Sequence, residues 1–167
     1  MNLSALPDTV AKEINKISKV AGYLWQREWV ERNGGNISMN LTSFFSDADQ
    51  PKSSVFIHQK FPEQAAGMYL FVTGAGCYIR SLIDDIEAAS CIVYINKQAS
   101  GYSIIWGGDA EGFRPTSELA SHLEIHFFNK INNPKNLAVL HAHPTELIVM
   151  SHHPLFKDEE KLNLKAQ

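Results

Sequence analysis

Two histidines separated by one residue, His141 and His143, are the clearest candidates for chemistry in this sequence. They follow an apolar run, residues 137–140, that predicts a strand of the buried type. Side chains two apart on a strand point to the same face, so both imidazoles would converge on one point. Zinc binds neutral imidazole nitrogen, and a catalytic site typically combines three protein ligands with an open position. The pattern therefore indicates either two ligands of a metal site or a hydrogen-bonded pair of histidines.

A second row of candidate ligands lies on a helix predicted over residues 116–129. Glu118, His122 and His126 are spaced four residues apart and hence share one helical face. Such a row could hold a metal by itself. Alternatively, the two histidines cover a polar side of the helix and bond to neighbouring elements, which we favour because histidines within helices are commonly structural. A carboxylate beside a metal could also act as a general base.

Groups that suit an anion stand near these candidates. Thr116 and Ser117 mark a helix start, where hydroxyls either cap the helix or help its unpaired N–H groups to hold a phosphate. Two glycine-rich turns, residues 33–36 and 73–76, offer close backbone approach and N–H groups to an anion, although such turns are also routine. Neither matches a nucleotide-binding loop. Together, an anion site, a metal on histidines and a carboxylate would suit carbanion chemistry on a phosphorylated carbonyl compound.

The elements that must position these residues follow from hydrophobic periodicity. A first helix is predicted over residues 8–32, stopped by Gly34 and Gly35, and a further helix is expected from Pro144. The apolar positions of the first helix recur at steps of three and four residues and are Val10, Ile14, Ile17, Ala21, Leu24 and Trp25. Strands are predicted over residues 37–41, 69–72, 91–95, 102–106 and 137–140, the third and fourth forming a hairpin. Residues 42–54 are expected to form a surface loop.

Composition limits the class of protein. The chain has 167 residues, 44% hydrophobic and 20% charged, which fits one globular domain. Its formal charge of -3 disfavours a nucleic-acid partner. No apolar run approaches the roughly 20 residues that cross a bilayer, and the first residues lack a signal-peptide pattern, so we expect a cytoplasmic protein with no membrane partner. Cys77 and Cys91 have no C-x-x-C partner, which argues against a disulfide framework.

Five motifs occur in order along the chain, and their combination is more specific than any one of them. They are Trp25-x-x-x-Trp29-x-Glu31-Arg32-Asn33-Gly34-Gly35-Asn36-Ile37-Ser38, Phe71-Val72-Thr73-Gly74-x-Gly76, Gly101-Tyr102-x-Ile104-x-Trp106-Gly107, Pro115-Thr116-Ser117-Glu118-Leu119-x-x-His122 and His141-x-His143. Their order and spacing, over residues 25–151, closely resemble the class II aldolase family. Within it, the first and third motifs favour the branch acting on rhamnulose 1-phosphate over the fuculose-phosphate aldolase and pentulose-phosphate epimerase branches.

The resemblance implies an α/β fold with a mainly antiparallel central sheet flanked by helices, assembled as a homotetramer. It implies one Zn²⁺ per subunit on His141 and His143, and Glu118 as the catalytic acid/base, which decides against the helical metal row. It implies reversible cleavage of L-rhamnulose 1-phosphate into dihydroxyacetone phosphate and L-lactaldehyde, in rhamnose degradation. The ketose-phosphate site would be lined by Asn33, Gly35, Asn36, Thr73, Gly74, Gly76, Thr116 and Ser117.

Two departures from the family pattern stand out. Ala75 replaces a serine on the phosphate-side turn. The family also supplies a third metal-binding histidine downstream of the position of Gln167, and His152 and His153 do not match it. We therefore expect residues 1–167 to form a single class II aldolase-like domain that is the N-terminal portion of a longer one. The alternative is a non-catalytic module that binds metal or sugar phosphate.

Overall fold

The computed structural model describes residues 3–46 and 56–156. Its strands are β1 (Asn36–Asn40), β2 (Ile57–His58), β3 (Tyr69–Thr73), β4 (Ser90–Ile95), β5 (Gly101–Gly107) and β6 (Ala138–His141). Its α-helices are α1 (Asp8–Gln26), α2 (Ser81–Asp84), α3 (Ile86–Ala89), α4 (Leu119–Asn132) and α5 (Thr145–His152). The predicted strands and the three longer helices therefore form, with shifted ends.

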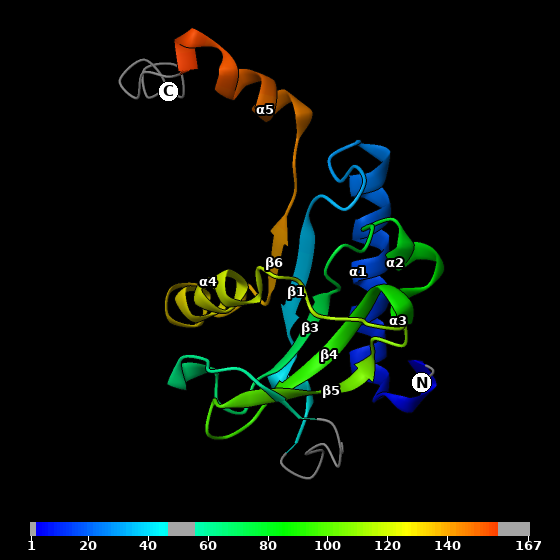
Figure 1. Cartoon of the computed structure of the whole chain (residues 1–167), viewed down its shortest axis with the longest axis vertical. Helices are drawn as coiled ribbons and strands as arrows, with labels where there is room; N and C mark the ends of the chain where they lie inside the picture. Colours follow the sequence, from blue (N-terminus) through cyan, green and yellow to red (C-terminus); the bar gives the residue numbers. More distant parts are fainter. Residues whose placement is uncertain (1–2, 47–55, 157–167) are drawn as a thin grey trace.

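The strands form one six-stranded sheet in the order β2-β5-β4-β3-β1-β6. Every neighbouring pair is antiparallel, and β4 and β5 form the predicted hairpin. The helices α1, α2 and α3 lie to one side of the sheet and α4 to the other (Figure 1). This arrangement confirms the predicted α/β fold with an antiparallel central sheet flanked by helices.

Alternation along β3 explains why both faces of the sheet are covered. Tyr69 and Phe71 join the core beneath α1, whereas Leu70 and Val72 join the core beneath α4. Neighbouring residues of a strand point to opposite faces. All four side chains are buried, because a core covers each face of the sheet. The amphipathic face predicted for α1 is confirmed at Val10, Ile14, Ile17, Ala21 and Leu24, which are buried, but Trp25 is exposed.

The first helix ends six residues earlier than its periodicity predicts. The N–H of Glu28 donates to the carbonyl of Trp25, and the N–H of Trp29 donates to that of Leu24. Glu28 adopts a left-handed conformation with φ of 59°. These features form a Schellman motif, in which a non-glycine residue takes the position that glycine usually holds. The stop predicted at Gly34 and Gly35 was therefore wrong, and residues 27–35 form a loop.

Two further expectations need correction. The strand before His141 was expected to be of the buried type, but β6 lies at the edge of the sheet, with Val139 buried and Leu140 44% exposed. Helix α4 begins at Leu119, three residues later than predicted, and Glu118 is its N-cap residue. Of the loop expected over residues 42–54, Thr42–Phe44 forms a short 3₁₀ helix and residues 47–54 lie outside the described part of the chain.

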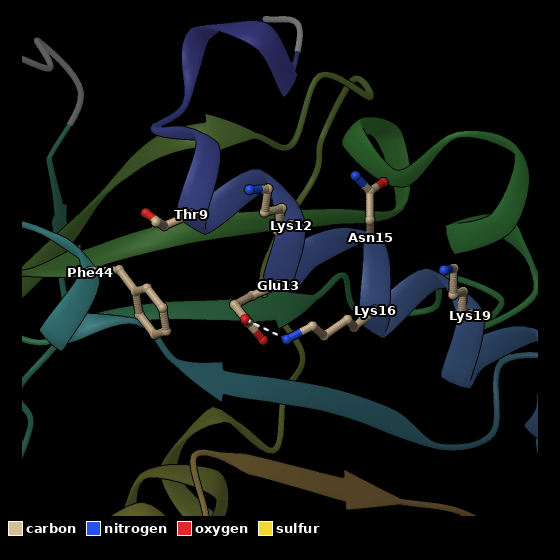
Figure 2. A pocket seen from close by; sticks show the side chains of 7 residues that line it. All are labelled: Thr9, Lys12, Glu13, Asn15, Lys16, Lys19 and Phe44. Carbon is tan, nitrogen blue, oxygen red and sulfur yellow. Dashed lines mark hydrogen bonds and ion pairs between the residues drawn. The ribbon is translucent and has the colours of Figure 1, made fainter.

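The surface carries two contrasting features. The outward face of α1 is polar, with Glu13 and Lys16 paired at 2.6 Å (Figure 2). A pocket of about 390 Å³ lies along it and contains none of the candidate site residues. By contrast, α5 projects away from the sheet at the end of β6 (Figure 1), with Leu147 and Val149 more than half exposed. Across residues 3–46 and 56–156, no helix has the length and apolar character needed to span a membrane.

Candidate active site

The pairing of β1 with β6 builds the centre of the site. Its register places Asn36 directly opposite His141, where β6 ends. Glu118, at the start of α4, reaches the same point, and its Oε2 lies 2.8 Å from Nδ1 of His141. The other ring nitrogen of His141, Nε2, lies 3.0 Å from Nε2 of His143. The fold therefore joins a carboxylate to two imidazoles that lie 23 and 25 residues further along the chain.

The two imidazoles suit a shared metal ion. Zinc at about 2.0–2.1 Å from each of two nitrogens, in tetrahedral geometry, separates those nitrogens by roughly 3.3 Å. The observed 3.0 Å is close to that separation. A carboxylate on the remaining ring nitrogen of a ligating histidine is the usual way of orienting that ring, and Glu118 stands there. Within the described part of the chain, however, no group of three or more His, Cys, Asp or Glu side chains is arranged to hold a metal.

The loop after α1 supports His143. The N–H of His143 donates to the carbonyl of Trp29 at 2.7 Å, and the indole Nε1 of Trp29 donates to Oε2 of Glu146 at 3.2 Å. Gly34 and Gly35 allow this approach, because a Cβ on Gly35 would stand 2.6 Å from the carbonyl oxygen of His141. Trp29 and Glu146 were not predicted as site residues. The presence of Trp29 in the first of the five sequence motifs was the signal that could have identified it.

Hydrogen bonding favours the ionised form of Glu118. The side-chain amide of Asn36 donates to the carboxylate and lowers its pKa, and His141 adds a favourable charge interaction. Partial burial opposes this shift, but Glu118 is largely exposed, with 46% of its side-chain surface accessible. The carboxylate is thus held in the form that accepts a proton and remains open to a small molecule.

Part of the candidate anion-binding set lies at the start of α4, next to Glu118. The turn at residues 73–76 meets the start of α4, since the N–H of Ala75 donates to Arg114 and the N–H of Thr116 donates to Thr73. The Thr73 hydroxyl is buried and accepts the N–H of Ile37 at 3.1 Å, which ties the turn to β1. Gly74 lies under Phe113 and Cys77, where a Cβ would clash, whereas Gly76 faces open space. Asn33 and Ser117 are exposed and Thr116 is buried.

His122 and His126 lie buried beneath this site and do not join His141 and His143 as ligands. Both rings are 2% exposed and both contact the hydroxyl of Ser38 on β1, at 2.6 Å and 2.8 Å. The interpretation that they bond to a neighbouring element is confirmed. Ser38 was not predicted to take part. Its signal in the sequence was a polar residue on a strand between the apolar residues Ile37 and Met39.

The chain is thus an α/β protein whose six-stranded antiparallel sheet, flanked by helices, carries a Glu–His–His cluster. A crystal structure described as a sugar-phosphate aldolase from Thermotoga maritima is similar to it, with a TM-score of 0.73 and 27% identity, covering 89% of this chain and 60% of that one. The family model for the class II aldolase and adducin N-terminal domain matches residues 15–163, and the chain belongs to this family.

Curated relatives agree. A rhamnulose-1-phosphate aldolase from Bacteroides thetaiotaomicron is 38% identical over 86% of this chain and 53% of its own length. The enzyme of the same name from Mannheimia succiniciproducens is 34% identical over 77% of this chain and 49% of its own length. The chain thus spans about half the length of the curated relatives that it matches.

Proposed function

We propose that this chain is a class II, zinc-dependent aldehyde-lyase that cleaves L-rhamnulose 1-phosphate into dihydroxyacetone phosphate and L-lactaldehyde. In this proposal the enzyme acts in the cytoplasm, in the degradation of rhamnose. The observation that carries the proposal is the contact of the Glu118 carboxylate with His141, whose other nitrogen meets His143. The names of the relatives support the substrate. The proposal includes assembly as a homotetramer, as in the family, and treats residues 1–167 as a class II aldolase-like domain that is the N-terminal portion of a longer one.

The reaction defines what the residues must do. Cleavage breaks the bond between C3 and C4 of the ketose phosphate. The C4 hydroxyl loses its proton and becomes the aldehyde, while the bonding electrons stay with C3, which must receive a proton to give dihydroxyacetone phosphate. We assign both proton transfers to Glu118: the ionised carboxylate takes the proton of the C4 hydroxyl and gives it to C3. We choose this residue because it is exposed, hydrogen-bonded and close to the proposed metal ligands. A positioned acid/base of this kind contributes roughly 10²–10⁴-fold in rate.

Binding is assigned to the groups around Glu118. The exposed turn at Gly76, with Asn33, Gly35, Gly74 and the hydroxyls of Thr73, Thr116 and Ser117, would hold the phosphate and sugar oxygens; Asn36 also lines this site. Fixed donors of this kind keep the reacting carbon beside the carboxylate. Since Thr73 already accepts a backbone N–H, its hydroxyl has a proton to donate.

Zinc would be held by His141 and His143. When bound, it supplies Lewis-acid stabilisation of the negative charge left on the substrate oxygens. Since the described residues provide two imidazoles and no arranged third ligand, we expect this chain alone to retain zinc weakly. Equilibrium dialysis with Zn²⁺ measures this directly, and His141→Ala should weaken binding further.

A coupled assay for dihydroxyacetone phosphate tests the proposal on the full chain with added Zn²⁺. We expect release from L-rhamnulose 1-phosphate, and a loss of roughly 10²–10⁴-fold in Glu118→Gln with zinc binding retained. Glu124→Gln, an exposed carboxylate on the same helix, is the matched control and should retain activity. Turnover by Glu118→Gln at the wild-type rate would remove Glu118 from the mechanism. Faster turnover of a fuculose or pentulose phosphate would assign a related branch.

A second candidate, a non-catalytic module that binds sugar phosphate, is favoured by the missing third ligand among the described residues. It predicts that L-rhamnulose 1-phosphate binds by calorimetry while no dihydroxyacetone phosphate is released at saturating Zn²⁺. Binding with turnover excludes this candidate, and binding without turnover supports it.

A further inference from the structure

A chain of buried hydrogen bonds runs beneath the candidate active site and has no role in the proposed function. His126 contacts the hydroxyl of Ser38, the hydroxyl contacts Nδ1 of His122, and Nε2 of His122 contacts Oδ1 of Asn36. All four side chains are at least 95% buried. The chain therefore links the middle of α4, through β1, to the amide that stands beside Glu118 and His141.

The chemistry of the four groups allows the chain two directions. Burial lowers the pKa of His122, and lowers that of His126 to about 4, so both rings are neutral at neutral pH and each has one donor and one acceptor nitrogen. If the oxygen of Asn36 faces His122, then Nε2 of His122 donates to it and Nδ1 accepts from Ser38. The oxygen of Ser38 then accepts from Nε2 of His126. If the amide is turned round, every donor and acceptor in the chain is reversed.

The two directions differ at Glu118. In the first, the N–H group of Asn36 faces the carboxylate and stabilises it. In the second, the amide oxygen faces the ionised carboxylate, which is repulsive and leaves that carboxylate without this donor. The direction of the buried hydrogen bonds therefore determines whether Asn36 offers a donor to the carboxylate. Residues on both β1 and α4 set that direction.

We propose that Ser38, His122 and His126 are positioning residues, which hold the side-chain amide of Asn36 with its oxygen toward α4 and its N–H group toward Glu118. The inference rests on the proposed function only in taking Glu118 as the residue that moves the proton. Their contribution is to orient a hydrogen-bond donor, since the two rings and the hydroxyl are buried and do not reach the exposed part of the site.

Nitrogen-15 NMR of the full wild-type chain at neutral pH tests the direction without a variant. We expect His122 and His126 both to carry their proton on Nε2, with Nδ1 unprotonated. We expect nuclear Overhauser contacts from the Nδ2 protons of Asn36 to the ring of His141. A proton on Nδ1 of His122 would mean that the buried hydrogen bonds run in the opposite direction, and it would overturn the proposal.

Ser38→Ala removes the hydroxyl between the rings, and Ser38→Thr is the matched variant that keeps it. We expect Ser38→Ala to mix the tautomers of His122, to weaken the contact between Asn36 and His141, and to slow release of dihydroxyacetone phosphate on the order of ten-fold. Ser38→Thr should restore the tautomer and most of the rate. Unchanged tautomers and rate in Ser38→Ala would show that the chain only packs α4 on β1. If the wild-type protein releases no product, the proposed function fails. The measurement of the ring nitrogens still decides the direction of the buried hydrogen bonds.

Discussion

At the scale of single residues, Gly35 illustrates how a backbone requirement supports the site. It has φ of 84°, and a Cβ there would stand 2.6 Å from the carbonyl oxygen of His141 and 3.1 Å from a methyl group of Val30. Both the conformation and the space therefore demand glycine. The close approach brings the loop after α1 against the end of β6, where the candidate metal ligands lie.

Gly35→Ala should lower the free energy of unfolding by more than Gly67→Ala. Gly67 has a similar φ of 77° but nothing within 4 Å of the added Cβ, so it isolates the backbone strain, about 1–2 kcal/mol. Gly35→Ala adds a clash with backbone and should exceed that loss by about 1 kcal/mol or more. Urea denaturation of both variants measures the difference. Equal losses would show that the end of β6 yields to the added methyl group.

His126 makes stability depend on acid. Burial lowers its pKa to about 4, below the ordinary 6.5 that it regains on unfolding. The unfolded chain therefore binds a proton between those values that the folded chain does not, so stability falls as the pH drops from about 6.5 to about 4. The contribution reaches about 3 kcal/mol for a shift of this size.

The measurement is urea denaturation as a function of pH. We expect His126→Gln, which keeps an N–H donor but does not titrate, to be less stable than the wild type at neutral pH and to lose less stability on acidification. A wild-type slope that persists in this variant would assign the acid sensitivity to other groups, among them His122.

At the scale of elements, α1 is held by one apolar face and ended by its own hydrogen bonds. Ile14 is fully buried against the sheet, whereas Val20 on the same helix is 40% exposed. The Schellman motif at Glu28 ends the helix before the glycines and leaves Trp29 free to bind His143. Termination of α1 therefore contributes directly to the geometry of the site.

Ile14→Ala should destabilise the protein by about 2–5 kcal/mol, because it leaves a cavity in the core beneath α1. Val20→Ala on the exposed side should change stability by about 0.5 kcal/mol or less. Thermal unfolding followed by circular dichroism compares the two. A small loss for Ile14→Ala would mean that the helix collapses onto the sheet and fills the space.

At the scale of the whole molecule, α5 is an unusually apolar projection. Leu147 is 60% exposed, Val149 is 63% exposed, and Leu140 on the adjoining edge strand is 44% exposed. A helix that exposes apolar side chains on more than one face usually marks an interface. These side chains are compatible with the homotetramer included in the proposed function.

We expect this chain to self-associate through α5, and the double variant Leu147→Glu, Val149→Glu to shift it toward the monomer of 18.7 kDa. Sedimentation velocity measures the distribution of species. Lys12→Glu, on the polar face of α1, is the control for surface charge and should leave association unchanged. A wild-type chain that sediments as a monomer at high concentration would contradict this expectation.

Local patterns were sufficient for the elements and for part of the site. Alternation, short apolar runs, helical periodicity and the position of proline predicted the longer strands and helices, because these signals depend on residues close in sequence. The spacing of His141 and His143 predicted that their rings converge, and the structure brings them to 3.0 Å. The same reasoning misplaced the end of α1. The Schellman motif places Glu28 in a left-handed backbone conformation, which a glutamate does not predict.

The tertiary structure decided which distant residues meet. Pairing of β1 with β6 sets Asn36 opposite His141, and packing of α4 on β1 brings His122 and His126 onto Ser38 and Glu118 onto His141. Periodicity assigns a side chain to a face but carries no register between elements that are far apart in the chain. The sequence by itself therefore determined the elements and the candidate ligands. Only the three-dimensional packing decided that β6 is an edge strand and that a buried chain of hydrogen bonds lies beneath Glu118.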